Sequence, residues 1–235
     1  MTTEGVAAPA RSFDLAVDDL RTINSRLHAP AADLARSWRV ENPDGAHNLA
    51  VGLNAPIEVE ILGHVGYYCA GMNQQATVEV RGSAGVGVAE NMMSGRVVIH
   101  GNASQSAAAT AHGGTLVIHG NASARCGISL KGADVLVRGS IGHMGAFMAQ
   151  SGRLVVCGDA GEALGDSLYE ADIYVLGEVK SLGADCEEKE MRDGDAFDLD
   201  ELLRAAGFDV AAADFRRFGS ARRLYNFDVD DAGGY

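Results

Sequence analysis

The chain has little basic charge and few cysteines. Among its 235 residues, 32 acidic side chains outnumber 19 basic ones, and the formal net charge is −13. Binding to nucleic acid needs a basic surface, so this charge argues against a nucleic-acid partner. The four cysteines form no CxxC pair, and we expect all of them to be ordinary thiols in a reducing compartment: Cys69, Cys126, Cys157 and Cys186.

Long apolar runs are absent as well. No stretch approaches 18 uninterrupted apolar residues, so we expect no membrane-spanning helix. The first residues, MTTEGVAAPARSFD, lack a basic start followed by an apolar run, and they predict no signal peptide. Together with the acidic composition, these features predict a soluble protein of the cytoplasm.

Motifs typical of an active site are also missing. There is no nucleophile elbow and no P-loop. There is no dinucleotide fingerprint either, because Gly82, Gly85 and Gly87 belong to a repeat and not to a strand-to-helix phosphate turn. Asp159 and Glu162 form a carboxylate pair on expected loops, with no apolar pocket apparent around them. We therefore predict no catalytic, cofactor-binding or metal-binding residue in this chain.

Glycine, by contrast, recurs with a fixed period. Aliphatic side chains stand two and four residues before each of these glycines, as Ile61 and Val59 do before the first. Side chains alternate along a strand, so both aliphatic positions point to the same side. The glycine that follows suits a bend whose backbone angles a side chain would forbid. Seven glycines make up this ladder, 19 residues apart: Gly63, Gly82, Gly101, Gly120, Gly139, Gly158 and Gly177.

The period predicts a solenoid. No insertion or deletion interrupts the seven units, so the coils must stack in register. Nineteen residues are too few for a helix-containing repeat, and the Leu-rich consensus of leucine-rich repeats is absent. Hexapeptide acyltransferases need a period of six, and pectin-degrading β-helices carry signals and loop insertions that we do not find. We predict an all-β fold, a right-handed parallel β-helix of about seven 19-residue coils over residues 57–183.

The two flanks are predicted to cap the open ends of this β-helix, which would otherwise pair with other chains. In the N-terminal flank (residues 1–56), apolar residues at helical spacing predict a helix over residues 17–27, and residues 47–53 are interpreted as an extended piece.

The C-terminal flank (residues 184–235) has an acidic start. Among its last 51 residues, 14 acidic side chains face 7 basic ones. The segment DLDELLRAA predicts a short helix over residues 198–206, ended by Gly207. The remaining tail has four arginines among aromatic residues, and we interpret it as an arm that lies on another surface.

One outward-facing column of the predicted strands is apolar. A free rod would carry polar residues three positions before each ladder glycine, as Glu60 and Glu79 do in the first two coils. An exposed apolar column marks a surface covered by another protein or by a flank of the chain, and of the two we favour a partner protein. The column comprises Val98, Val117, Leu136, Val155 and Tyr174.

Two histidines join this candidate partner interface. His100 and His119 occupy the same outward position in adjacent coils, so their rings are expected about 5 Å apart. Arg81 and Arg138 flank them in the same column and would repel a metal cation, and no carboxylate or thiol completes a site there. We therefore interpret the pair as part of a surface ladder.

The glycine ladder, with local forms such as Gly139-Ser-Ile-Gly142-His-Met-Gly145, resembles the GXGXG domain at the C-terminus of the glutamate synthase large subunit. The resemblance covers residues 57–183. The flanks NPDGAHNLAVGL and FRRFGSARRLYNFDVDDAGGY look closer to the stand-alone B-type subunits of N-methylglutamate synthase and related split glutamate synthases, including the GlxC-like proteins. The second glycine of the motif, Gly142 here, is replaced by Ser104, Ser123 and Lys180 in other coils.

This resemblance implies a hetero-oligomer of three kinds of subunit. They are an amidotransferase-like protein, the β-helix, and a protein that carries FMN and an iron–sulfur cluster. The implied reaction makes N-methylglutamate from glutamate and methylamine, or glutamate in the synthase branch. The β-helix contributes no catalytic residue in such systems and packs between the catalytic domains. The module also resembles the C subunit of formylmethanofuran dehydrogenase, which stays open as an alternative, as do the amine used and the stoichiometry.

Overall fold

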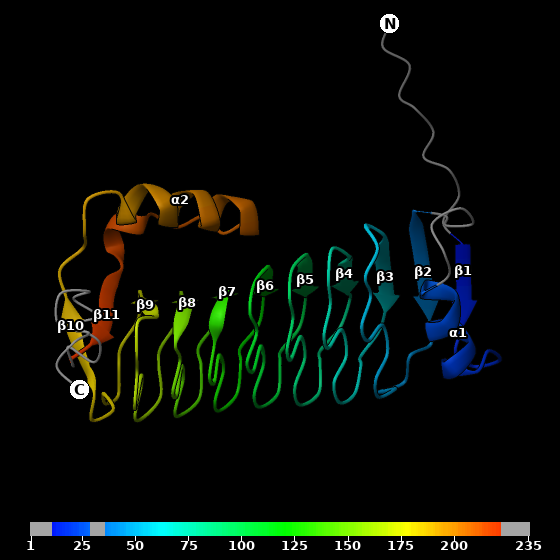
Figure 1. Cartoon of the computed structure of the whole chain (residues 1–235), viewed down its shortest axis with the longest axis horizontal. Coiled ribbons are helices and arrows are strands. Elements are labelled where there is room, and N and C mark those ends of the chain that lie inside the picture. The colour runs from blue at the N-terminus through cyan, green and yellow to red at the C-terminus, as the bar shows by residue number, and fades with distance from the viewer. Residues whose placement is uncertain (1–10, 29–35, 222–235) are drawn as a thin grey trace, which may run out of the picture.

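The protein is a long rod of stacked coils, seen in a computed structural model that describes residues 11–28 and 36–221 (Figure 1). Within these residues, nine consecutive strands pair in parallel along one side of the rod, so the predicted parallel β-helix of about seven coils is confirmed. The strands are β1 (Arg11–Asp14), β2 (Ser37–Glu41), β3 (Glu58–Leu62), β4 (Thr77–Val80), β5 (Arg96–Ile99), β6 (Thr115–Ile118), β7 (Lys131–Val137), β8 (Ser151–Val156) and β9 (Asp172–Val175).

The strands stack in the register that the glycine ladder predicts. Val78 of β4 pairs with Val97 of β5, and Val97 pairs with Leu116 of β6, each one full repeat further along the chain. The aliphatic side chains two and four residues before each ladder glycine point into the rod, where Leu116 and Ile118 are fully buried. One continuous apolar core therefore runs along the axis of the coils.

Glycine is required at the ladder positions for a different physical reason from the one predicted. Only Gly63 has a positive φ among the seven, so the bend itself does not require glycine at the other six. A Cβ on Gly120 would instead lie 2.6 Å from the carbonyl oxygen of Gly101 in the coil before it. The N–H of Gly120 donates to that same oxygen at 3.0 Å. The glycines are needed because successive coils approach each other closely at this corner.

A second corner of each coil is built from residues in the left-handed region. Positive φ occurs five, seven and nine residues after each of the first six ladder glycines, as at Ser106, Ala108 and Thr110. The N–H of Ala108 donates to the coil before it, at Val88, and the N–H of Ser106 to the coil after it, at Ala124. Left-handed φ costs a non-glycine residue about 1 to 2 kcal/mol. These hydrogen bonds between coils offset that cost.

At the N-terminal end, β1 and β2 continue the parallel sheet before residue 57. The helix α1 (Leu20–Leu27) is shorter than predicted, since its N-cap is Asp19, which accepts a hydrogen bond from the N–H of Thr22. Its buried face packs on the end of the core. Residues 47–53 form tight turns and not the predicted extended piece.

At the C-terminal end, the chain doubles back over the rod. β10 (Cys186–Lys189) is followed by α2 (Asp195–Ala206), the 3-10 helix η2 (Ala212–Asp214) and β11 (Arg216–Ser220). The predicted helix is confirmed, and Gly207 ends it with a φ of +74°. β11 inserts antiparallel between β9 and β10, so this part of the predicted arm is a packed strand. Residues 222–235 of that arm lie outside the described residues.

No helix found in the described part of the chain is long and apolar enough to span a membrane. The four cysteines are free, as predicted.

Candidate functional site

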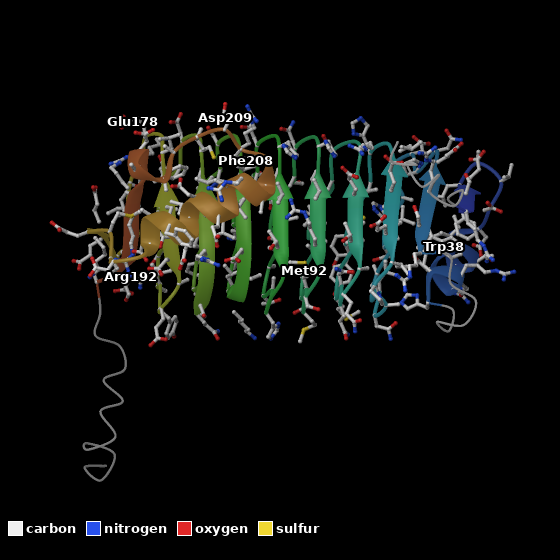
Figure 2. All side chains as sticks on the ribbon, turned by 90° about the horizontal axis from the view of Figure 1, so that it is seen from above. Trp38, Met92, Glu178, Arg192, Phe208 and Asp209 are labelled. Atoms are coloured by element: carbon white, nitrogen blue, oxygen red, sulfur yellow. The ribbon has the colours of Figure 1, made fainter. Side chains whose placement is uncertain are left out.

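The apolar column on the outer face of the sheet is covered by the chain itself. Its five side chains are at most 7% exposed, and they pack against α2 and the residues that follow it. We name residues 190–215 the C-terminal strap. Figure 2 shows α2 of the strap lying across the strands of the C-terminal half of the rod. The covering residues of the strap are Leu199, Leu203, Ala206, Phe208, Ala212 and Phe215.

The predicted partner interface is therefore corrected at this column. The choice lay between another protein and a flank of the chain, and the structure shows the flank. Val98, Val117, Leu136, Val155 and Tyr174 hold the strap in place and are buried beneath it.

His100 and His119 lie at the edge of the strap. Their rings stack with centroids 5.1 Å apart, as predicted, and the edge of His119 meets Phe208 at 5.5 Å. Burial lowers the pKa of His119, and the charges of His100, Arg138 and Arg96 lower it further. Nowhere in residues 11–28 and 36–221 do three or more potential metal ligands cluster.

Beyond the strap, the same sheet face is open and charged. Glu60 pairs with Arg39 and Arg81, each at 2.9 Å, and Arg81 also pairs with Glu79 at 3.0 Å. Hydrogen bonding from Arg81 is the main cause that lowers the pKa of Glu60. His100 closes the network with its Nε2 atom 2.6 Å from Glu79. These side chains are partly solvated, so each pair contributes little to stability.

Ion pairs fix the strap at its start. Arg192 pairs with Asp172 of β9 at 2.5 Å and with Asp195 at 2.9 Å. Arg217 of β11 pairs with the same two carboxylates, at 2.7 Å from Asp172 and 3.4 Å from Asp195. Burial raises the pKa of Asp195, but hydrogen bonds from the side chain and backbone of Arg192 and the charges of Arg192 and Arg217 outweigh it. The net result is a lowered pKa for this carboxyl.

A single arginine holds the far end of α2. The Nη2 atom of Arg96 on β5 donates to the carbonyl oxygen of Ala205 at 2.9 Å. Carbonyl groups at a helix C-terminus lack partners within the helix, and a cation there also matches the helix dipole. The strap is therefore attached at both ends, near β9 and near β5.

A polar ladder that the sequence interpretation missed follows the glycine ladder. The residue after each of the first six ladder glycines accepts a hydrogen bond from the backbone N–H one coil later, as Asn102 does from Asn121 at 2.8 Å. The signal in the sequence is a short hydrogen-bonding side chain at one position in six coils. The acceptors are His64, Ser83, Asn102, Asn121, Ser140 and Asp159.

This ladder also accounts for the carboxylate pair considered from the sequence. Asp159 accepts from the N–H of Glu178 at 2.9 Å, whereas Glu162 pairs with Lys180 at 2.7 Å. The two carboxylates therefore have separate partners. The thiols offer no activated nucleophile either, because burial raises the pKa of both Cys69 and Cys126 to about 12.

Away from the strap, the turn segments of the coils expose large apolar side chains. Tyr67 is 47% exposed, Met72 43%, and Val86 and Met148 41% each. Tyr68 stacks on Tyr67 with ring centroids 5.6 Å apart. These side chains were not among the predicted interface residues, because they follow the glycine and not the strand.

Comparison with known proteins gives one result of high similarity. Protein GlxC of Rhizobium meliloti (strain 1021) is 60% identical over 227 residues, which cover 95% of this chain and 99% of that protein. No protein-family model matches the chain.

Proposed function

The chain belongs to the family of protein GlxC, and on that premise we propose that it is a structural, non-catalytic subunit of a glutamate-synthase-related enzyme complex. The observation that supports this most is the unbroken glycine ladder from Gly63 to Gly177. It resembles the GXGXG domain of the glutamate synthase large subunit, which serves as a rigid packing module between catalytic domains.

The use of polar side chains in the rod agrees with a structural role. The ladder from His64 to Asp159 joins each coil to the next. Arg96 bonds to Ala205, Arg192 to Asp172 and Arg217 to Asp195, and these contacts attach the strap to the rod and to β11. These groups stabilise a rigid body along its whole length. A rigid rod of this kind can hold two larger subunits at a constant separation.

Within that family, the most specific function we propose is in N-methylglutamate synthase. The complex would convert glutamate and methylamine to N-methylglutamate and ammonia. The partners would be an amidotransferase-like subunit and a subunit that carries FMN and an iron–sulfur cluster. This chain would carry no cofactor itself. It would keep the two catalytic sites in register so that ammonia or methylamine passes between them without loss, in the cytoplasm.

The test is to isolate the native protein gently and to identify the proteins that come with it. We expect an amidotransferase-like protein and a yellow-brown protein with bound flavin and iron. Turnover that depends on methylamine would assign the N-methylglutamate branch, and turnover with ammonia the glutamate synthase branch. Isolation with a molybdenum or tungsten protein would favour the formylmethanofuran dehydrogenase alternative. A lone monomer would contradict the proposal.

A further inference from the structure

The turn segments form a continuous surface that we name the turn ridge. It consists of the residues four to nine positions after each of the first six ladder glycines, which turn on the side of the rod away from α2 (Figure 1). Two apolar clusters stand on it. In the first two coils they are Tyr67, Tyr68, Met72 and Val86, and in the fourth and fifth coils Ile128, Met144, Phe147 and Met148.

The turn ridge is poor in charge. Only four of its 36 residues are charged, whereas 22% of the whole chain is charged. Charged residues are depleted in the buried centre of protein interfaces, where tyrosine, phenylalanine and methionine are enriched. The ridge therefore has the composition of an interface centre, and the open strand face with its ion pairs does not. Its segments are residues 67–72, 86–91, 105–110, 124–129, 143–148 and 162–167.

One of the four charges, Glu90, lies near the tyrosines. A Cβ placed on Gly87 would be 2.8 Å from Oε2 of Glu90 and 3.8 Å from ring atoms of both Tyr67 and Tyr68. Burial raises the pKa of Glu90. Within the described ranges, no donor pairs with this carboxylate. An unpaired, partly buried carboxylate near two aromatic rings is complementary to a cation from outside the chain.

Arginine fits this arrangement better than lysine does. Its planar guanidinium can stack on an aromatic ring while it donates two hydrogen bonds to a carboxylate. We propose that the turn ridge binds a partner subunit through apolar contacts, and that the partner places an arginine side chain against Tyr67, Tyr68 and Glu90. This inference rests on the proposed function, because it takes the partner to be another subunit of the same complex.

The repeat supplies substitutions that the fold already accepts. Gln105 stands at the position of Tyr67 and Val86, and Ser106 at the position of Tyr68, with the same positive φ. A triple variant Tyr67→Gln, Tyr68→Ser, Val86→Gln therefore replaces three of the four side chains of the first cluster, all but Met72, with residues native to the third coil. Ala109 likewise justifies Glu90→Ala. The matched control is Ser167→Asn, which copies Asn91 at a ridge position outside both clusters.

The experiment measures binding of the full-length chain and each variant to the subunits that co-purify with the native protein. We expect the triple variant to lose binding, and Glu90→Ala to weaken it by about 30-fold or more, as for one lost partner of a buried charge pair. Ser167→Asn should bind as the unmodified chain does. Thermal unfolding of each variant verifies that the rod is intact.

Three results would overturn the inference, and they are distinguishable. If the unmodified chain binds its subunits and every variant binds equally well, the ridge is not the interface and the proposed function stands. If the unmodified chain binds no subunit, the proposed function fails and this inference fails with it. If sedimentation of the isolated chain shows a dimer that the triple variant dissociates, the ridge belongs to a second copy of the chain.

Discussion

At the scale of single residues, glycine has two separate uses in this rod. From Gly82 to Gly177, the ladder glycines face the backbone of the preceding coil, where any Cβ would lie within 3 Å of another atom. Gly127 has a φ of +70°, with nothing within 4 Å of an added Cβ. The first use is steric and the second conformational, so the same substitution should have different effects at the two positions.

Gly120→Ala should destabilise the protein by about 1 to 3 kcal/mol, the usual cost of overpacking. Its Cβ would lie 2.4 Å from Oδ1 of Asn102 and 2.6 Å from the carbonyl oxygen of Gly101. The matched control is Gly127→Ala, because Ala70, Ala89 and other alanines occupy its repeat position with positive φ. We expect a smaller loss there, about 1 kcal/mol, which is the lower end of the cost of a left-handed φ. Urea unfolding measures both, and equal losses would contradict the steric explanation.

His119 should make stability depend on pH. Burial and the charges of His100, Arg138 and Arg96 lower its pKa in the folded state below the ordinary value of about 6.5. The folded protein then binds fewer protons than the unfolded chain, so its stability is full above about pH 6.5 and falls as the pH drops through the lowered pKa. Urea midpoints at pH 7.5 and 5.5 should fall less in His119→Gln than in the unmodified protein. An equal fall in both proteins would exclude His119 as the cause.

Residue patterns in the sequence predicted much of the rod and little of its surface. The ladder glycines and the aliphatic positions before them were sufficient for the coil register, because one core position repeats without interruption. Ala70, Ala89, Ala108, Gly127, Ala146 and Gly165 form a small-residue ladder at the left-handed corner, and this signal was present but missed. The predicted reason for glycine at the ladder positions, a backbone bend, was wrong. The actual reason is a close approach between two coils, which cannot be seen in the sequence of a single repeat.

At the scale of elements, the strap creates a second apolar core on the outer side of the sheet. Neighbouring residues of β7 point into different cores, with Val135 inside the rod and Leu136 beneath the strap. The sequence could not decide what covers Leu136, since Leu199 and Leu203 stand on a helix in which half of the other residues are charged. Only the path of the chain between β10 and β11 brings that helix over the column.

A charged substitution at Val135 or at Leu136 should disrupt only the core into which that side chain points. Leu136→Asp buries an unpaired carboxylate beneath the strap, so the strap should detach while the rod stays folded. Trypsin should then cleave rapidly after Arg204 in α2. Val135→Asp places the same carboxylate in the rod core and should abolish cooperative unfolding. Leu203→Asp, made on the strap itself, should reproduce the cleavage of Leu136→Asp. Cleavage of Leu136→Asp no faster than that of the unmodified protein would contradict the assignment.

At the scale of the whole molecule, the strap spans a fixed number of coils. Its attachments lie at β9, through Asp172, and at β5, through Arg96. Four spacings of about 4.8 Å separate these strands, roughly 19 Å in all. A helix of 12 residues such as α2 is about 18 Å long at 1.5 Å per residue. The length of α2 therefore matches the number of coils it covers.

This match predicts that an added coil is tolerated at one place and not at another. Because each coil contacts only its neighbours, a copy of residues 82–100 inserted before Gly101 should lengthen the rod and leave the strap attached at both ends. A copy of residues 139–157 inserted before Gly158 lengthens the span beneath the strap by about 4.8 Å, so Arg96 should lose Ala205, and His119 should lose Phe208. Hydrogen exchange at residues 96–100 should stay slow in the first variant and accelerate in the second. Equal exchange rates in the two variants would mean that the strap can stretch to cover an added coil, so that its length does not limit the number of coils beneath it.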